Sequence, residues 1–109
     1  MATSPVGEFE QLVLLAILQC GETAFGLEVR AEIEESAGRQ VSRGAFYTTL
    51  DRLEKKGYLE WEEATPADRE RTAPLRRFKV TPVGLTGLRA SRRALQALWR
   101  GLDEILEGS

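Results

Sequence analysis

The chain has 109 residues and a mass of 12.2 kDa, which suffices for one compact domain but not for two with separate cores. Its apolar content of 42% and its net charge of −2 exclude a disordered chain. The sequence contains no histidine and one cysteine, Cys20, which excludes histidine general bases and the usual zinc ligand sets. We therefore expect no enzyme, no metal and no cofactor.

Hydropathy and cysteine content predict a cytoplasmic protein without membrane contact. The longest apolar run, residues 12–18, is far shorter than the roughly 20 residues that span a bilayer. No positive charge precedes this run, so we expect no secretory signal. A single cysteine cannot form an internal disulfide, which is typical of a reducing compartment.

Charge is distributed unevenly along the sequence, although the overall pI is about 5.3. Residues 1–38 contain seven Glu and one Arg, whereas residues 69–79 contain five basic side chains and one acidic. A protein that is acidic overall can still present a positive face, because a binding surface responds to the local potential.

Apolar residues at helical spacing predict a first helix over residues 9–20 that is nearly buried on all sides. Gly21 is the expected C-cap of this helix. Thr23 is the expected N-cap of a second helix, in which apolar residues recur every four positions from Phe25. Gly38 is expected to end it.

The sequence from Ser42 predicts a third helix that runs to about Lys56 and stops at Gly57. Four of its positions are expected to face inward, namely Phe46, Thr49, Leu50 and Leu53. Its outward positions are mostly basic or small and polar: Arg43, Tyr47, Thr48, Asp51, Arg52 and Lys55.

Two alternating, β-prone segments follow, residues 58–62 and 77–80, and a polar loop joins them. The pair Thr81-Pro82 then predicts the start of a helix. If this helix runs to Leu106, it is about 37 Å long at 1.5 Å per residue. Leucine recurs in it every seven residues, which predicts pairing with another helix.

The predicted order is three helices, a two-stranded hairpin and a long helix, a mainly α winged helix-turn-helix fold. In a helix-turn-helix the exposed face of the third helix enters the major groove of DNA. We interpret residues 1–80 as the DNA-binding domain and residues 81–109 as a dimerisation helix of the same compact unit.

Residues 42–59, SRGAFYTTLDRLEKKGYL, resemble the signature of PadR-type winged-helix transcriptional regulators. Gly26-Leu27-Glu28 is similar to that family's Gly-Tyr-Glu, and residues 78–84 resemble the end of its wing. The single C-terminal helix resembles the family's small subgroup, which dimerises through that helix. The resemblance implies a repressor. One departure is the wing, where the family's glycine is missing and Pro74 is present.

Three sets of residues are candidates for binding. Double-stranded DNA is expected to contact the third helix and the basic wing, through Ser42, Arg43, Tyr47, Thr48, Arg52, Lys55, Arg76, Arg77 and Lys79. A homodimer that reads a pseudo-palindromic operator is expected to form through Phe9, Leu12, Leu88, Leu95, Leu98, Leu102 and Ile105. The resemblance to small family members further implies that Trp99 stacks a planar aromatic effector in a cavity of the dimer.

Two other functions remain open at this point. A winged helix can serve as a protein-docking module, and the acidic first and second helices would then form its contact surface. The protein could also act mainly as a small-molecule sensor through Trp99, since an indole offers stacking and cation–π attraction to a flat ligand.

Overall fold

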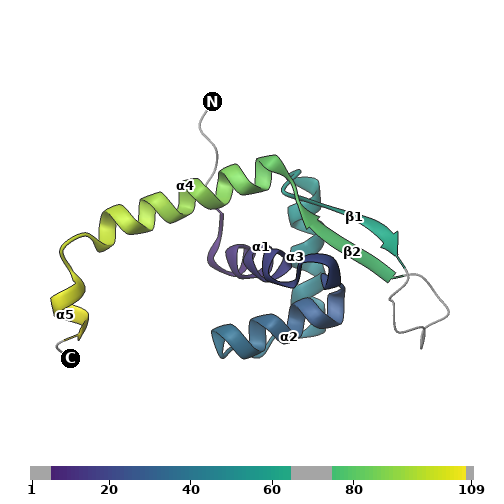
Figure 1. The fold of residues 1–109 in the computed structure, drawn as a ribbon, viewed down its shortest axis with the longest axis horizontal. Helices are drawn as coiled ribbons and strands as arrows, with labels where there is room; N and C mark the ends of the chain where they lie inside the picture. The colour runs from purple at the N-terminus through teal and green to yellow at the C-terminus, as the bar shows by residue number, and fades with distance from the viewer. Residues whose placement is uncertain (1–5, 65–74, 108–109) are drawn as a thin grey trace.

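The computed structural model of this protein describes residues 6–64 and 75–107, and it is mainly helical with a two-stranded antiparallel sheet, as the sequence predicts (Figure 1). A single 3₁₀ turn, η1 (Gly21–Thr23), connects the first two helices. The other elements are α1 (Glu8–Cys20), α2 (Gly26–Ala37), α3 (Arg43–Lys55), β1 (Leu59–Ala64), β2 (Leu75–Val80), α4 (Pro82–Trp99) and α5 (Asp103–Glu107).

Most of the predicted helix caps are present. The Ser42 hydroxyl accepts a hydrogen bond from the Ala45 amide at 3.1 Å and begins α3, and Gly38 ends α2 in the left-handed conformation. The prediction for Thr23 is wrong, because this residue lies in η1 and its hydroxyl donates to the Cys20 carbonyl. Phe25 is the N-cap of α2 instead.

Helix α1 supplies the centre of the core and packs against both α2 and α3. Val13 and Leu14 on α1 are fully buried, together with Phe46 and Leu53 on α3. The expectation that α1 is buried on all sides is wrong. Its Leu15 and Leu18 are 47% and 46% exposed, because no element of the described protomer covers that side.

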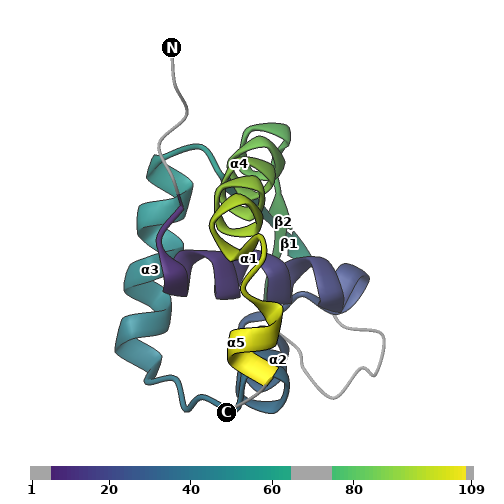
Figure 2. The ribbon, with the colours of Figure 1, turned by 90° about the vertical axis from the view of Figure 1, so that its left-hand side faces the viewer.

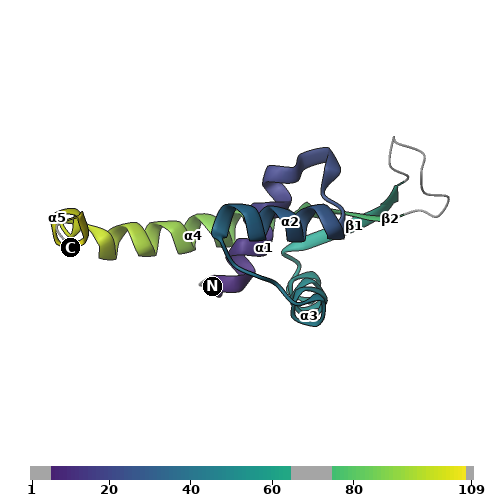
Figure 3. The ribbon, with the colours of Figure 1, turned by 90° about the horizontal axis from the view of Figure 1, so that it is seen from below.

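The hairpin packs on the helices through one face. Trp61 pairs with Phe78 and Leu59 with Val80 in the antiparallel register, and Leu59, Phe78 and Val80 are buried. The Phe78 amide also donates to the Ala24 carbonyl at 2.9 Å, which fixes β2 against the start of α2. The hairpin therefore extends to one side of the helices as a wing (Figure 3).

The first half of α4 is attached to the turn between α3 and β1. Thr81 donates twice, from its amide to the Tyr58 carbonyl and from its hydroxyl to the Gly57 carbonyl. The Ser91 hydroxyl accepts a hydrogen bond from the Val6 amide at 3.0 Å, so the N-terminal segment also holds this helix. Leu88, which the sequence predicts at a dimer interface, is only 9% exposed and packs in the core of its own chain.

The second half of α4 projects away from the helices, opposite the wing (Figure 3). The last helix does not run unbroken to Leu106 as predicted: it ends at Trp99, because the backbone leaves the helical region at Arg100 and Gly101 has a φ of 79°. We call residues 92–107 the arm. Every residue of the arm is exposed, and the molecule measures 52 × 37 × 23 Å.

None of the helices within residues 6–64 and 75–107 combines the length and the apolar character that crossing a membrane requires.

Candidate nucleic-acid interface

The four positions of α3 predicted to face inward are all buried, and the six predicted to face outward are all exposed. Burial of one face leaves Thr48, Arg52 and Lys55 along the opposite face of the same helix. Helix α3 therefore presents a mostly basic and small polar surface, with Ser42 at its exposed N-terminus.

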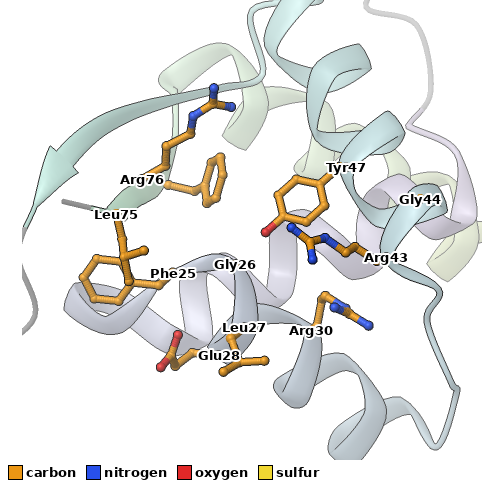
Figure 4. Close-up of a pocket in the computed structure, with 11 residues that line it drawn as sticks. Phe25, Gly26, Leu27, Glu28, Arg30, Arg43, Gly44, Tyr47, Leu75 and Arg76 are labelled. Atoms are coloured by element: carbon orange, nitrogen blue, oxygen red, sulfur yellow. The ribbon is translucent and has the colours of Figure 1, made fainter. Parts of the chain in front are cut away.

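A hollow of about 950 Å³ lies between this face, the start of α2 and the strand β2 (Figure 4). We call it the basic groove. Three arginines from three different elements line it: Arg30 of α2, Arg43 of α3 and Arg76 of β2. Its other lining residues are Phe25, Gly26, Leu27, Glu28, Gly44, Tyr47, Leu75 and Phe78.

Tyr47 crosses the basic groove rather than pointing straight to solvent, and it is 37% exposed. A Cβ atom on Gly26 would lie 2.5 Å from the Tyr47 hydroxyl oxygen, so a larger residue here would require the Tyr47 side chain to shift. The ring also packs edge-on against Phe46, with the centroids 5.2 Å apart. These contacts leave the hydroxyl at the groove surface beside the first turn of α2.

The guanidinium group of Arg43 lies next to the Tyr47 hydroxyl, and Arg30 lies farther along the same wall of the groove (Figure 4). Arg43 has its guanidinium carbon 5.7 Å from the centre of the Tyr47 ring, within the range of a cation–π contact. Arg30 donates from Nη2 to the Val41 carbonyl at 3.1 Å, while its buried Nε has no hydrogen-bond partner among the described residues. Arg43 and the Tyr47 hydroxyl thus place donors side by side at the groove, and Arg30 adds a further charge to its lining.

The strand β2 divides the basic wing residues between its two faces. Arg76 lines the basic groove and stacks 4.4 Å from the centre of the Trp61 ring. Arg77 lies on the other face, where Glu22 and Glu62 both pair with it. Lys79 lines that same outer face. Of these three wing residues, Arg76 shares the basic groove with α3, and contact of the wing with DNA stays a prediction. The loop arginines Arg69 and Arg71 lie outside the described residues.

Carboxylates pair with some of the described cations but with none of the arginines that line the groove; the α4 arginines Arg89, Arg92, Arg93 and Arg100 are also unpaired among the described residues. Carboxylates hold Arg39, Lys56 and Arg77. Four arginines on or beside α3 have no carboxylate within 4.0 Å among residues 6–64 and 75–107. They are Arg30, Arg43, Arg52 and Arg76. Their charges are available to an anionic partner.

Arg30 and Gly26 belong to this site, although the sequence pattern did not indicate them. Arg30 lies on a helix that is acidic in sequence, and only the fold brings it beside Arg43. The helix-turn-helix order could have indicated it, because the second helix crosses the nucleic-acid backbone in this arrangement.

The described residues contain no group of three or more His, Cys, Asp or Glu side chains that could hold a metal ion. Burial raises the pKa of the Cys20 thiol, and the charges of Glu32 and Glu28 add to this effect. The thiol is therefore the protonated, weakly nucleophilic form at neutral pH.

A comparison with protein-family models matches residues 14–90 to the transcriptional regulator PadR-like family. The chain belongs to this family. Its members are transcriptional regulators rather than enzymes. The transcriptional regulator Rv3488 of Mycobacterium tuberculosis is 41% identical to the chain over 71 residues, which are 65% of the chain and 60% of that protein. The chain thus matches about three fifths of the length of this relative.

Solved structures of PadR-family regulators share the fold. A regulator from Clostridium difficile R20291 matches with a TM-score of 0.72 at 15% identity, over 92% of this chain and 99% of that one. A PadR-like transcription factor from Bacteroides fragilis matches with a TM-score of 0.60 at 24% identity, over 92% of this chain and 87% of that one. At these identities the likeness shows the winged-helix fold.

Proposed function

We propose that this PadR-family chain is a cytoplasmic repressor that binds double-stranded DNA as a homodimer, with the exposed face of α3 in the major groove. The observation that carries the proposal is the set of unpaired cations along α3 and the basic groove, namely Arg30, Arg43, Arg52 and Arg76. Cations without carboxylate partners fit a backbone of closely spaced phosphates. Repression is what the resemblance to the family implies.

The residues divide by the contact that each would make. Arg43 and Thr48 lie near the N-terminus of α3, where a recognition helix reaches base edges. The Tyr47 hydroxyl would donate to a backbone phosphate at the mouth of the groove, and Arg30, Arg52 and Arg76 would add charge around it. Ser42 and Lys55 mark the two ends of the reading face.

The dimer part of the proposal is supported by large apolar side chains on the arm. Leu95, Leu98, Leu102 and Ile105 are all exposed there, and Leu98 is 75% exposed. An apolar stripe of this kind marks an interaction surface. Phe9 and Leu12 on α1 are half-buried and would contribute the other wall. Residues 81–109 would then join two winged-helix units, residues 1–80, into one assembly.

The decisive experiment is selection of bound DNA from a random pool, followed by fluorescence anisotropy across salt concentrations. For a selected site we expect Arg43→Ala to weaken binding and relax base preference, by about 1–3 kcal/mol if the contact is bidentate. Arg52→Ala should weaken binding to all sequences and reduce the salt slope by about one. Arg89→Ala on α4 is the control of equal charge change, because this exposed arginine does not line the groove.

The same experiment separates the alternatives. Failure to select DNA, or binding without a steep salt dependence, would contradict the proposal and favour a protein-docking module. Loss of binding in Arg89→Ala equal to that in Arg43→Ala would instead show that overall charge, rather than the α3 face, controls affinity.

Effector binding by Trp99 is a second candidate function, favoured by a half-exposed indole on the arm. Trp99 ends α4 beside the apolar stripe, where a second protomer would enclose a flat ligand. Quenching of fluorescence by a planar aromatic cation should persist in Trp61→Phe and disappear in Trp99→Phe. Since the chain has only these two tryptophans, persistence in Trp99→Phe would exclude this role.

A further inference from the structure

Helix α4 and its C-cap carry four arginines, whereas residues 82–100 contain no acidic side chain. The four are Arg89, Arg92, Arg93 and Arg100, and all of them are exposed. At 3.6 residues per turn, their side chains fall within a sector of about 100° around the helix axis. We call this row of residues the arginine stripe.

Ordinary solvation does not explain the composition of the arginine stripe. A solvated helix face usually carries both signs of charge, because acidic and basic residues three or four positions apart stabilise a helix. Arg89 forms like-charge pairs at these spacings with Arg92 and Arg93, and such pairs destabilise a helix. No carboxylate of residues 6–64 and 75–107 lies within 4.0 Å of the stripe. Unpaired charges of one sign are typical of a surface that meets an anionic partner.

The arginine stripe points away from the body of the protomer. Its centre lies about 150° around the helix axis from the centre of the buried α4 residues, which are Gly84, Gly87, Leu88 and Ser91. Figure 2 looks nearly along α4 and shows this helix on one side of α1, with α2 on the other side. The lining of the basic groove includes no described residue of α4. We therefore expect a short duplex held on α3 to leave the stripe free.

The dimensions and chemistry of the stripe fit the backbone of duplex DNA. From Arg89 to Arg100 the helix rises about 16 Å, and one strand of B-DNA places about five phosphates along this length. Guanidinium groups match phosphate oxygens in paired hydrogen bonds. Ala90 and Ala97 flank the stripe on one side, and their short side chains allow close approach. A single surface carboxylate would neutralise one arginine, whereas a row of phosphates offers a partner to all four.

We propose that the arginine stripe binds the phosphate backbone of a second DNA duplex, while α3 and the basic groove hold the first. Each protomer then connects two DNA segments, and the protein bridges or loops DNA in addition to occupying an operator. The stripe reads no sequence, because its contacts are to phosphates. This inference goes beyond the proposed function, and it does not require α3 to bind DNA, since the two surfaces are separate.

Binding of a random-sequence duplex to the full chain tests the stripe directly. In a background of Arg43→Ala with Arg52→Ala, which weakens the α3 surface, anisotropy titrations should give a log–log salt slope of about −3 to −4. Arg92→Gln with Arg93→Gln, added to this background, should make the slope shallower by about two and weaken binding at least about tenfold near 0.1 M salt. Arg92→Lys with Arg93→Lys should keep the slope, because lysine also neutralises a phosphate.

A control variant separates the stripe from the overall charge of the protein. Gln19→Glu with Ser36→Glu changes the net charge by the same two units at exposed positions outside α4, and it should weaken binding far less. Circular dichroism and sedimentation check that the fold and the mass of each variant are unchanged. Equal weakening in this control, or no weakening in Arg92→Gln with Arg93→Gln, would overturn the proposal.

Capture of a second duplex tests the bridge. Operator duplex is fixed to beads and saturated with wild-type protein, which should then retain a labelled duplex of unrelated sequence. Arg92→Gln with Arg93→Gln should remain on the operator and retain little of the second duplex. Operator binding without capture by the wild type overturns the bridge and leaves the proposed function intact.

Two further results would assign the stripe differently. If no operator is found but random-sequence duplex still binds through Arg92 and Arg93, the proposed function fails and the stripe is confirmed as a DNA-binding surface. Polyglutamate is the probe for an acidic protein partner. Binding of polyglutamate as tight as that of a duplex, and lost in the same stripe variant, would overturn the assignment to DNA.

Discussion

Gly44 is the second residue of α3, and no other part of the described chain lies within 4 Å of the position that a Cβ would take. Packing therefore does not require glycine there, although glycine costs a helix about 1 kcal/mol relative to alanine. Close approach of another molecule to the helix backbone is a reason to keep it.

We expect Gly44→Ala to leave the free energy of unfolding unchanged or raise it by up to about 1 kcal/mol. The same change should weaken DNA binding, because the methyl group stands between α3 and the groove of the duplex. Urea unfolding and anisotropy titration measure the two effects. Equal or tighter DNA binding would show that this part of α3 does not approach the duplex.

Glu10 is a buried carboxylate that joins α1 to the end of α3. It accepts hydrogen bonds from the Lys56 ammonium, at 2.9 Å to one oxygen, and from the Gly7 amide at 3.0 Å. Burial by itself raises the pKa of Glu10, but these hydrogen bonds and the charges of Lys56 and Arg52 outweigh it, so the pKa lies below its ordinary value of 4.5.

A lowered pKa means that the Glu10 carboxylate stabilises the fold fully above its unfolded pKa and loses this effect as the pH falls through the folded value. Glu10→Gln should lower the free energy of unfolding by about 1–2 kcal/mol at neutral pH. Between roughly pH 5 and pH 3 the wild type should lose stability more steeply than this variant, until the difference narrows. Parallel pH profiles from urea unfolding would contradict the assignment.

The sequence predicted correctly which residues of α3 are buried and which are exposed, but it did not predict the surroundings of Tyr47. Helical periodicity separates Phe46 from Tyr47, because burial of one face depends on spacing alone. It carries no information on the neighbour across the turn. The contact with Gly26 and the proximity of Arg30 therefore became visible only with the fold.

The start of α4 packs closely against the turn at Tyr58, because Gly84 has no side chain. A Cβ on Gly84 would overlap the Tyr58 carbonyl oxygen and lie 2.8 Å from a Val80 methyl carbon. The helix start is thus pressed against the turn that follows α3, where Thr81 is also bonded.

Gly84→Ala should therefore lower the free energy of unfolding by about 1–3 kcal/mol, because backbone on one side and a strand on the other leave no room for the methyl group. Gly44→Ala is the matched control, since it makes the same chemical change on a helix surface with open space. Chemical denaturation of both variants gives the comparison. Similar stabilities would contradict this account of the α4 base.

Element boundaries were predicted best where a local signal fixes them. Ser42 and Thr81 cap their helices through their own side chains, so the start of α3 and of α4 follows from sequence. The end of α4 did not follow, because leucine spacing continues through the turn at Gly101. Periodicity alone does not distinguish one long helix from two that are separated by a bend.

For the whole molecule, the exposed leucines of the arm predict that the isolated protomer is incomplete. Leu98→Asp should convert the assembly, expected at about twice 12.2 kDa, to a folded monomer, because it places a charge within the apolar stripe. Sedimentation equilibrium measures the mass, and far-ultraviolet circular dichroism checks the fold.

Val83→Asp is the control for Leu98→Asp, since Val83 is an exposed apolar residue on the same helix but outside the arm. It should leave the mass unchanged. A dimeric Leu98→Asp protein would place the interface elsewhere, and a monomeric wild type would remove the two-fold assembly from the proposed function.

The attachment of α4 to the turn after α3 has a consequence for any operator that this protein reads. Thr81 fixes the start of α4 to the turn that follows α3, so in the proposed homodimer the separation of the two α3 helices would depend on where the arms cross and not on the wings. Lengthening α4 by one turn, about 5.4 Å, would change the distance between the two α3 helices of the proposed dimer. It would therefore change the number of base pairs between half-sites. In the proposed dimer, operator spacing would thus depend on the length of a helix that makes no base contact itself.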